Sequence, residues 1–458
     1  MNHIFGWKGG WMRIWMVIAL LAGLLLVGCT GIPTVGEQQA WQDQETVGRI
    51  YRPGGERPVL PKLDTNAPLH DFLLFAMLSQ PQVEAAYFDW AASVRRITVE
   101  RSLPDPRLTF QSDITNVVMT LMPGLMTDFP GPGKLSAAAH VATAESEAKY
   151  FAFESSVLQT AFAFKKAYYQ LHFLDAKIGV YHDMLRLAVE SEKLALIQNE
   201  VGKVTLQDVL RAQIEQERIT TDIANLDDSR MPLLAQFKAA LGLKAEDAPP
   251  PVPQKLETTP LDVTAEMLFA TALARNPRLK AMEADVRMAE ASILLATKAK
   301  VPDFSAGIEA DVKASPVMLR PSFGITLPVW RDKIAAQIAG AQAGKRAAAA
   351  RLSAEQIALA VEFAEKSFMF REASRNLELL NERLLTMARQ SLEVAQSGYV
   401  GGKVDLLNVI DAERTLLDIQ LAEVEAHLQR ELALAELSLL ILGMPPENAP
   451  LLPPTATF

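Results

Sequence analysis

Residues 201–212 read VGKVTLQDVLRA, and residues 401–412 read GGKVDLLNVIDA. Six positions are identical at an offset of 200: Gly202, Lys203, Val204, Leu206, Val209 and Ala212 recur as Gly402, Lys403, Val404, Leu406, Val409 and Ala412. Other landmarks recur at a similar offset: Pro81 with Pro277, Pro104-Asp105 with Pro302-Asp303, Phe129-Pro130 with Leu327-Pro328, and Leu241-Gly242 with Leu442-Gly443. A near-constant offset over so much of the chain indicates two copies of one structural unit.

The first 28 residues are typical of a bacterial targeting segment. Lys8 and Arg13 provide a positive start, and the uncharged apolar run Ile14–Gly28 is shorter than the roughly 20 residues that span a bilayer. The run ends in Leu-Val-Gly-Cys, which resembles a lipobox, where the signal is cleaved and the cysteine is acylated. Cys29 is the only cysteine of the chain, so we expect it to carry lipid. The threonine after it favours sorting to the outer membrane.

Each copy also contains a stretch with the alternation of β-strands. Residues 107–118 alternate apolar and polar side chains, and residues 304–312 and 317–329 do so more cleanly. The pattern predicts one hairpin per copy, with strands of roughly 10–12 residues, the length that crosses an outer membrane when tilted. A soluble, half-buried hairpin would alternate in the same way, and the lipid signal favours the membrane. Alternation is weak from Met119 to Phe129, so the register there stays open.

One hairpin per copy gives four strands per chain, and four strands cannot close a barrel. Open strand edges in lipid leave backbone groups without hydrogen-bond partners, which is prohibitively costly. If the strands span the membrane, several chains must pool them. The sequence therefore predicts an oligomer.

Long helices follow each hairpin. Residues from Gly133 to about Glu200 and from Lys333 to about Ser397 contain no proline, and each stretch would be roughly 100 Å long as a helix. Apolar residues recur at alternating steps of three and four, which is coiled-coil spacing. A second helix is expected after each duplicated turn, over residues 205–241 and 405–442. Each copy thus predicts a long helical hairpin, and the fold class is mainly α with a small β part.

These patterns divide the chain into six parts. They are a signal peptide (1–28), a lipidated arm expected to be extended (29–65), a first repeat (66–243), a Pro-rich linker (244–261), a second repeat (262–443) and a tail (444–458).

Composition and motifs argue against several classes of protein. The net charge of −9 and the lack of a basic run with interleaved aromatics argue against nucleic-acid binding. The six histidines show no pair at metal-ligand spacing, and Met119, Met122 and Met126 fit packing better than soft-metal contact. No catalytic arrangement of side chains is evident. We therefore expect no enzyme, no metal and no cofactor beyond the lipid on Cys29.

The chain resembles the lipoprotein branch of the TolC-like outer membrane efflux factors over residues 66–443. Its most specific pieces are Pro104-Asp105-Pro106, Gly131-Pro132-Gly133-Lys134 and residues 402–412. The resemblance implies a homotrimer that pools twelve strands into one outer-membrane barrel and extends its helices as a hollow tunnel into the periplasm. It also implies a periplasmic adaptor docked at the tips, around Gly202, Lys203, Gly402 and Lys403, and an inner-membrane pump.

A gate at the tip is implied by the same resemblance. Asp411 matches a family aspartate, and Asn408 stands where some members have a second one. Asp208 matches an aspartate that bonds to a tyrosine across the tip, and Tyr399 matches that tyrosine, whereas Val404 replaces an accompanying arginine. Three carboxylates around a narrow opening would favour cations. The alternatives are a carboxylate that only stabilises a helix start and, for Tyr399 with Asp208, a solvated surface pair.

Two other functions stay open on the sequence. One is the exit duct of a type I protein secretion system, which shares this architecture. The other is a non-conducting coiled-coil structural lipoprotein, which would not need strands of membrane-crossing length. The cargo is not indicated by the sequence.

Overall fold

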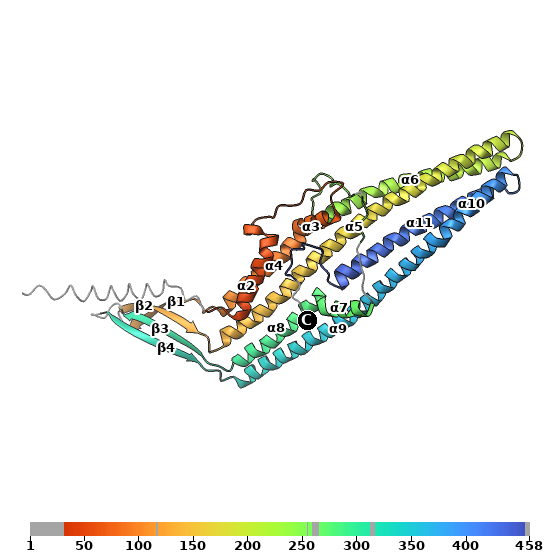
Figure 1. Cartoon of the computed structure of the whole chain (residues 1–458). Coiled ribbons are helices and arrows are strands. Elements are labelled where there is room, and N and C mark those ends of the chain that lie inside the picture. The colour runs from red at the N-terminus through yellow and green to blue at the C-terminus, as the bar shows by residue number, and fades with distance from the viewer. Residues whose placement is uncertain (1–31, 116–117, 254, 259–264, 312–316, 454–458) are drawn as a thin grey trace, which may run out of the picture.

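The computed structural model describes residues 32–115, 118–253, 255–258, 265–311 and 317–453. Figure 1 shows an elongated molecule with a small sheet at one end and the tips of two helical hairpins at the other. None of the described helices combines the length and apolar composition needed to cross a membrane. The predicted signal peptide (1–28) and Cys29 lie outside the described residues.

The sheet is built by both repeats. Its strands are β1 (Arg107–Thr115), β2 (Val118–Phe129), β3 (Asp303–Asp311) and β4 (Met318–Thr326), in the antiparallel order β1-β2-β3-β4. The two predicted hairpins are confirmed. Pairing of β2 with β3, from Phe129 opposite Phe304 to Gly124 opposite Glu309, joins the repeats and was not predicted. Among the described strands, β1 and β4 are the edges of the sheet.

The register of β2, which the sequence left open, runs from Thr115 opposite Val118 to Arg107 opposite Met126. Every residue of β1 therefore has a partner on β2, without a bulge.

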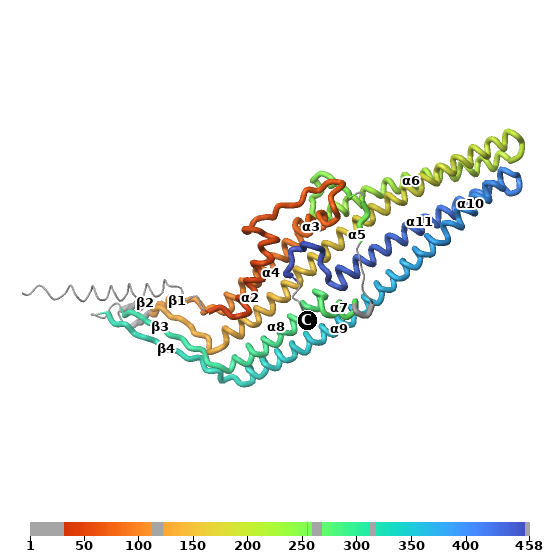
Figure 2. The backbone as a smooth tube through the Cα atoms, in the orientation of Figure 1, coloured from red at the N-terminus to blue at the C-terminus, as the bar shows by residue number. Residues whose placement is uncertain are grey.

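The long helical hairpins are confirmed. Their helices are α5 (Lys134–Glu200) and α6 (Leu206–Ala240) in the first repeat, and α9 (Arg331–Leu379), α10 (Leu385–Val400) and α11 (Leu406–Glu436) in the second. A π-helical turn at Leu380–Leu384 separates α9 from α10, and another at Leu437–Ile441 ends α11. The backbone trace brings the two hairpin tips to the same end of the molecule (Figure 2).

Shorter helices precede each hairpin. They are α3 (Leu69–Ser79) and α4 (Pro81–Arg101) in the first repeat, and α7 (Ala265–Arg275) and α8 (Pro277–Lys298) in the second. The α5 helix packs against α4, α6 and α8, so it forms the centre of the helical part.

One prediction is wrong: residues 35–51 of the arm, expected to be extended, form helix α2 (Val35–Tyr51). Thr34 caps this helix, since its Oγ1 accepts a hydrogen bond from the backbone N–H of Glu37 at 3.2 Å. Glu37 is completely buried and pairs with Arg101 of α4. Thr34 and Glu37 have the Thr-x-x-Glu spacing of a capping box. The Gly and Pro content of the arm hid that signal.

Aromatic side chains fix the first-repeat helices to α5. Trp90 of α4 stacks on Phe153 of α5 with ring centroids 6.0 Å apart. Phe164, also on α5, contacts Phe72 of α3 at 6.1 Å and Phe237 of α6 at 5.3 Å. All five rings are buried, and buried aromatics provide much of the apolar area that stabilises a core.

The recurring Pro and Leu-Gly landmarks meet in space. Gly242 ends the first repeat with φ of +72°, and a Cβ there would lie 2.9 Å from the Cα of Gln80, the residue before Pro81. Gly443 has φ of +63°, and its Cβ would lie 3.0 Å from Cδ of Pro277. In both repeats a left-handed glycine therefore allows the end of the hairpin to lie directly on the start of the preceding helix.

This close approach generates a prediction for Gly242→Ala. The substitution forces a left-handed alanine and pushes Cβ into backbone, so it should lower the free energy of unfolding by about 3 kcal/mol. Gly202→Ala is the matched control, because Gly202 has φ of +71° with nothing within 4 Å; it should cost only about 1 kcal/mol. Denaturant unfolding followed by circular dichroism measures both, and equal costs would contradict the close-approach argument.

Candidate functional site

The duplicated segments form the same turn at both hairpin tips. Gly202 and Gly402 adopt left-handed conformations with φ of +71° and +67°. The N–H of Lys203 donates to the carbonyl of Gln198 at 2.9 Å, and that of Lys403 donates to the carbonyl of Gly398 at 2.8 Å. This is the Schellman pattern that ends a helix, and it needs glycine at the left-handed position. The recurrence of Gly-Lys-Val therefore has a local structural cause.

The two hairpins share one hydrophobic core near these tips. It contains Ala195, Val209 and Ile219 of the first hairpin together with Leu392, Leu406, Val409 and Leu416 of the second. The tips of a single chain are therefore packed against each other.

Tyr399 lies in this core, 4% exposed, and its hydroxyl has no hydrogen-bond partner in the described part of the chain. Burial, and after it the charge of Asp208, raises the pKa of Tyr399. The charge of Asp208 thus acts on Tyr399, but no hydrogen bond joins the two side chains in the described part of the chain. Asp208 instead caps α6, since its Oδ2 accepts from the N–H and Oγ1 of Thr205 at 3.1 and 3.0 Å. The bonded contact between Tyr399 and Asp208 stays a prediction.

Asp411 and Asn408 are both exposed on α11. Asp411 is the sixth residue of the helix, which begins at Leu406. The helix dipole acts mainly within the first turn, so capping does not account for this carboxylate. Nothing in the described chain covers either side chain, and their role at a constriction stays a prediction.

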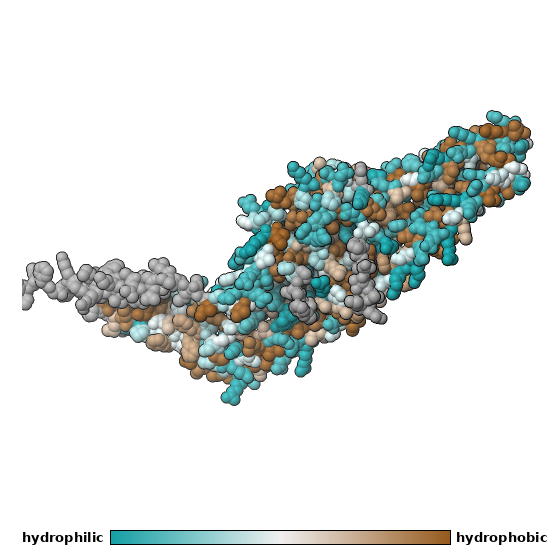
Figure 3. Space-filling view, in the orientation of Figure 1, coloured by the Kyte–Doolittle hydropathy of each residue, from teal (hydrophilic) through white to brown (hydrophobic). Residues whose placement is uncertain are grey.

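The two tips differ in what they expose. On α6, Leu206, Leu210 and Ile214 are 63%, 50% and 66% exposed and form one stripe at helical spacing. Their counterparts Leu406 and Ile410 are buried. Figure 3 shows hydrophobic side chains on the surface at this end of the molecule. Gly202, Lys203, Gly402 and Lys403, the predicted docking residues, are exposed at the two turns.

Comparison with known proteins connects this architecture to a family. Residues 268–442 match the outer membrane efflux protein family. The chain is 24% identical over 241 residues to CzcC, the cobalt-zinc-cadmium resistance protein of Cupriavidus metallidurans. The aligned region makes up 51% of this chain and 56% of CzcC. The family match lies within the second repeat, and the chain spans little more than half the length of CzcC.

Solved structures extend the likeness in fold over both repeats of the chain. The outer-membrane channel OprN superposes with a TM-score of 0.71 at 17% identity, over 82% of this chain and 90% of OprN. VceC of Vibrio cholerae superposes with a TM-score of 0.68 at 19% identity, over 82% of this chain and 96% of VceC. The similarity to these structures is one of fold.

A polar contact that the sequence did not predict also holds the two hairpins together. Arg414 of α11 donates to both carboxylate oxygens of Glu215 on α6, through Nε at 3.0 Å and Nη2 at 2.5 Å. Glu215 is 5% exposed. The neighbouring residue, Glu413, is also buried, and its Oε1 accepts a hydrogen bond from Oγ of Ser191 on α5 at 2.6 Å.

A signal for these residues was present in the sequence. Glu215 falls between Ala212 and Ile219 at seam spacing of three and four, and Glu413 falls between Val409 and Leu416 at spacing of four and three. An acidic residue at a seam position requires a partner when it is buried.

Removal of the arginine tests the ion pair. Arg414→Gln leaves Glu215 buried without its bidentate partner, and we expect a cost of about 1–2 kcal/mol, since half of the arginine side chain is exposed. Hydrogen exchange of residues 206–223 should accelerate accordingly. Arg211→Gln is the control, because Arg211 pairs with Asp208 only at 3.7 Å on the surface. Equal exchange in both variants would contradict a stabilising role for Arg414.

Glu413 predicts a pH dependence. Burial raises the pKa of Glu413 above its ordinary value, the hydrogen bond from Ser191 opposes the shift, and the charges of Glu215 and Glu190 add to it. The pKa of the Glu413 carboxyl is higher in the folded than in the unfolded state. The stabilising contribution of the protonated carboxyl is therefore fully present below the unfolded pKa, and it is lost as the pH rises through the folded pKa.

Glu413→Gln should therefore raise the midpoint of thermal unfolding at about pH 7.5 relative to the natural chain. The difference should shrink as the pH falls below about 3.5, where the carboxyl is largely protonated in both states. A difference that does not change with pH would show that the buried charge is not its cause.

Proposed function

We propose that three copies of this chain form an outer-membrane channel that conducts solutes from the periplasm to the exterior and does no chemistry of its own. The carrying observation is the sheet of four strands with two open edges at the end of long paired helices. Pairing of β4 of one copy with β1 of the next would give every edge a partner and close a ring of twelve strands. The fold shared with OprN and VceC supports this assembly.

Membrane attachment is proposed to have two parts. The pooled strands would span the outer membrane, and lipid on Cys29 would tether the chain to the same membrane. A lipid chain tethers without spanning, so the anchor would complement the strands.

The tips are the proposed docking surface for a periplasmic adaptor, which would join the channel to an inner-membrane pump. Gly202, Lys203, Gly402 and Lys403 are exposed at the two turns. CzcC is a cobalt-zinc-cadmium resistance protein, and the similarity to it favours efflux of small solutes over protein secretion for this chain.

Asp411 is proposed to line the constriction. In a trimer its three copies would form a negative ring that favours cations. Tyr399 and Asp208 would lie beside the ring, where movement of the hairpins would change their contact.

Single-channel recording tests the proposal. We expect the purified mature protein to give small, cation-selective openings in a planar bilayer, and Asp411→Ala to reduce the preference for cations. Asp227→Ala, an exposed carboxylate on α6 away from the tip, is the charge-matched control and should leave selectivity unchanged.

Two results would count against the proposal. A protein that inserts without conducting would favour a structural lipoprotein, and a protein that stays monomeric in mild detergent could not pool its strands. If Asp411→Ala left the ion selectivity of the openings unchanged, the protein would still be a channel, but Asp411 would not line its constriction.

A further inference from the structure

A group of exposed cationic and aromatic side chains surrounds the start of α9, at the end of the sheet that adjoins the helices. Trp330, Arg331 and Lys333 follow β4, and Lys300 lies in the turn before β3. We call these four residues the basic junction. Because Asp303 pairs with Thr326 at this end of the sheet, both connections reach the same level of the molecule.

The positive charges of the basic junction are uncompensated. The side chains of Lys300, Arg331 and Lys333 form no ion pair with the described part of the chain, and Asp332 is the one acidic residue among residues 329–333. The corresponding connection of the first repeat differs, since its Lys134 is neutralised by Asp303 at 2.7 Å. The N-terminus of α9 adds partial positive charge at the same place.

Apolar side chains continue from the basic junction onto the sheet. Trp330 is 74% exposed, and Leu327 and Val329 are 61% and 63% exposed. A tryptophan ring is amphipathic and is enriched where a membrane meets water. An exposed tryptophan between an apolar strand and lysine or arginine side chains fits such an interface better than bulk solvent.

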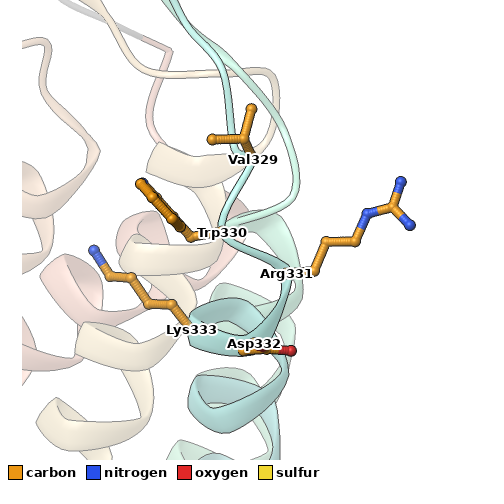
Figure 4. Close-up of a pocket in the computed structure, with 5 residues that line it drawn as sticks. All are labelled: Val329, Trp330, Arg331, Asp332 and Lys333. Atoms are coloured by element: carbon orange, nitrogen blue, oxygen red, sulfur yellow. The ribbon is translucent and has the colours of Figure 1, made fainter.

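Two crevices lie at the basic junction. One, of about 540 Å³, is lined by Lys300 and Arg331 together with Pro328, Ile334 and Ile338. The other, of about 580 Å³, is lined by Val329–Lys333. Figure 4 shows that Trp330 and Lys333 point to one side of the helix start and Arg331 to the other. Each crevice therefore combines a cation with apolar walls.

We propose that the basic junction binds the headgroups of anionic phospholipids. The phosphate would lie between Lys300 and Arg331 or beside Lys333, and the acyl chains would follow Leu327 and Val329 along β4. Basic pockets next to membrane-spanning segments bind anionic headgroups in this way. The inference rests on the proposed function, since it requires the sheet to span a membrane whose inner surface lies at the junction.

Native mass spectrometry of the detergent-solubilised assembly tests the site. The natural protein should retain phosphatidylglycerol in preference to phosphatidylcholine. The triple variant Lys300→Gln, Arg331→Gln, Lys333→Gln should bind phosphatidylglycerol about tenfold or more weakly. The control variant Lys193→Gln, Arg375→Gln, Arg389→Gln removes the same charge from exposed helix positions and should bind as the natural protein does.

Conductance in phosphatidylcholine bilayers, measured on the same proteins, separates this inference from the channel. Conductance without preferential retention of phosphatidylglycerol would reject the lipid site and keep the channel, whereas a natural protein that inserts but does not conduct would reject the channel. Displacement of phosphatidylglycerol by millimolar inorganic phosphate would assign the site to soluble anions and overturn the proposal. Altered ion selectivity with unchanged lipid retention would also overturn it, because the cations would then line the passage.

Discussion

The backbone groups along the outer sides of β1 and β4 impose the constraint on which the other features depend. Among the described strands these two have no outer neighbour, and in lipid an unpaired edge has no water to replace its partner. A second copy of the chain offers the matching edges. Its β1 could pair with β4 of the first copy in antiparallel orientation, because every neighbouring pair of strands in the sheet is antiparallel. In the proposed assembly a ring of copies would follow from that pairing, and the helices attached to the strands would then form a ring as well.

The duplication gives this ring its regularity. Each repeat supplies a hairpin and a long helical pair, and the pairing of β2 with β3 continues the sheet from the first repeat into the second without a gap. At the other end of each repeat, Gly242 and Gly443 lie on the starts of α4 and α8. Pro81 and Pro277 suit those starts because proline is well tolerated in the first turn of a helix. The recurring prolines and Leu-Gly pairs that revealed the duplication therefore mark where the end of each repeat packs against the start of an earlier helix in the same repeat.

Local patterns in the sequence were sufficient to predict the strands and the long helices, and they failed for helix α2 and for pairings between distant segments. Alternation predicted the strands of each hairpin, and proline-free seams predicted α5 and α9. The pairing of β2 with β3 depends on residues about 180 positions apart, which no local pattern encodes. Helix α2 was missed because Gly and Pro dominate the arm, although Thr34 and Glu37 have capping-box spacing. At the tip, the proximity of Tyr399 to Asp208 was predicted through the resemblance, whereas Arg414 with Glu215 has no local signature beyond an acid at a seam position.

The contrast between the two tips indicates where movement is easiest. Leu206 and Leu406 occupy equivalent positions, yet Leu406 is buried between the hairpins of one chain and Leu206 is exposed. In the proposed trimer, the stripe of Leu206, Leu210 and Ile214 would be covered by a neighbouring chain. The contact within a chain is fixed by the directional pairs Arg414–Glu215 and Ser191–Glu413, whereas the contact between chains would be apolar and non-directional. Movement at an apolar contact breaks no hydrogen bond or ion pair, whereas movement between the two hairpins of one chain would break both directional pairs. Opening of the tip would therefore separate neighbouring chains before it separates the two hairpins of one chain.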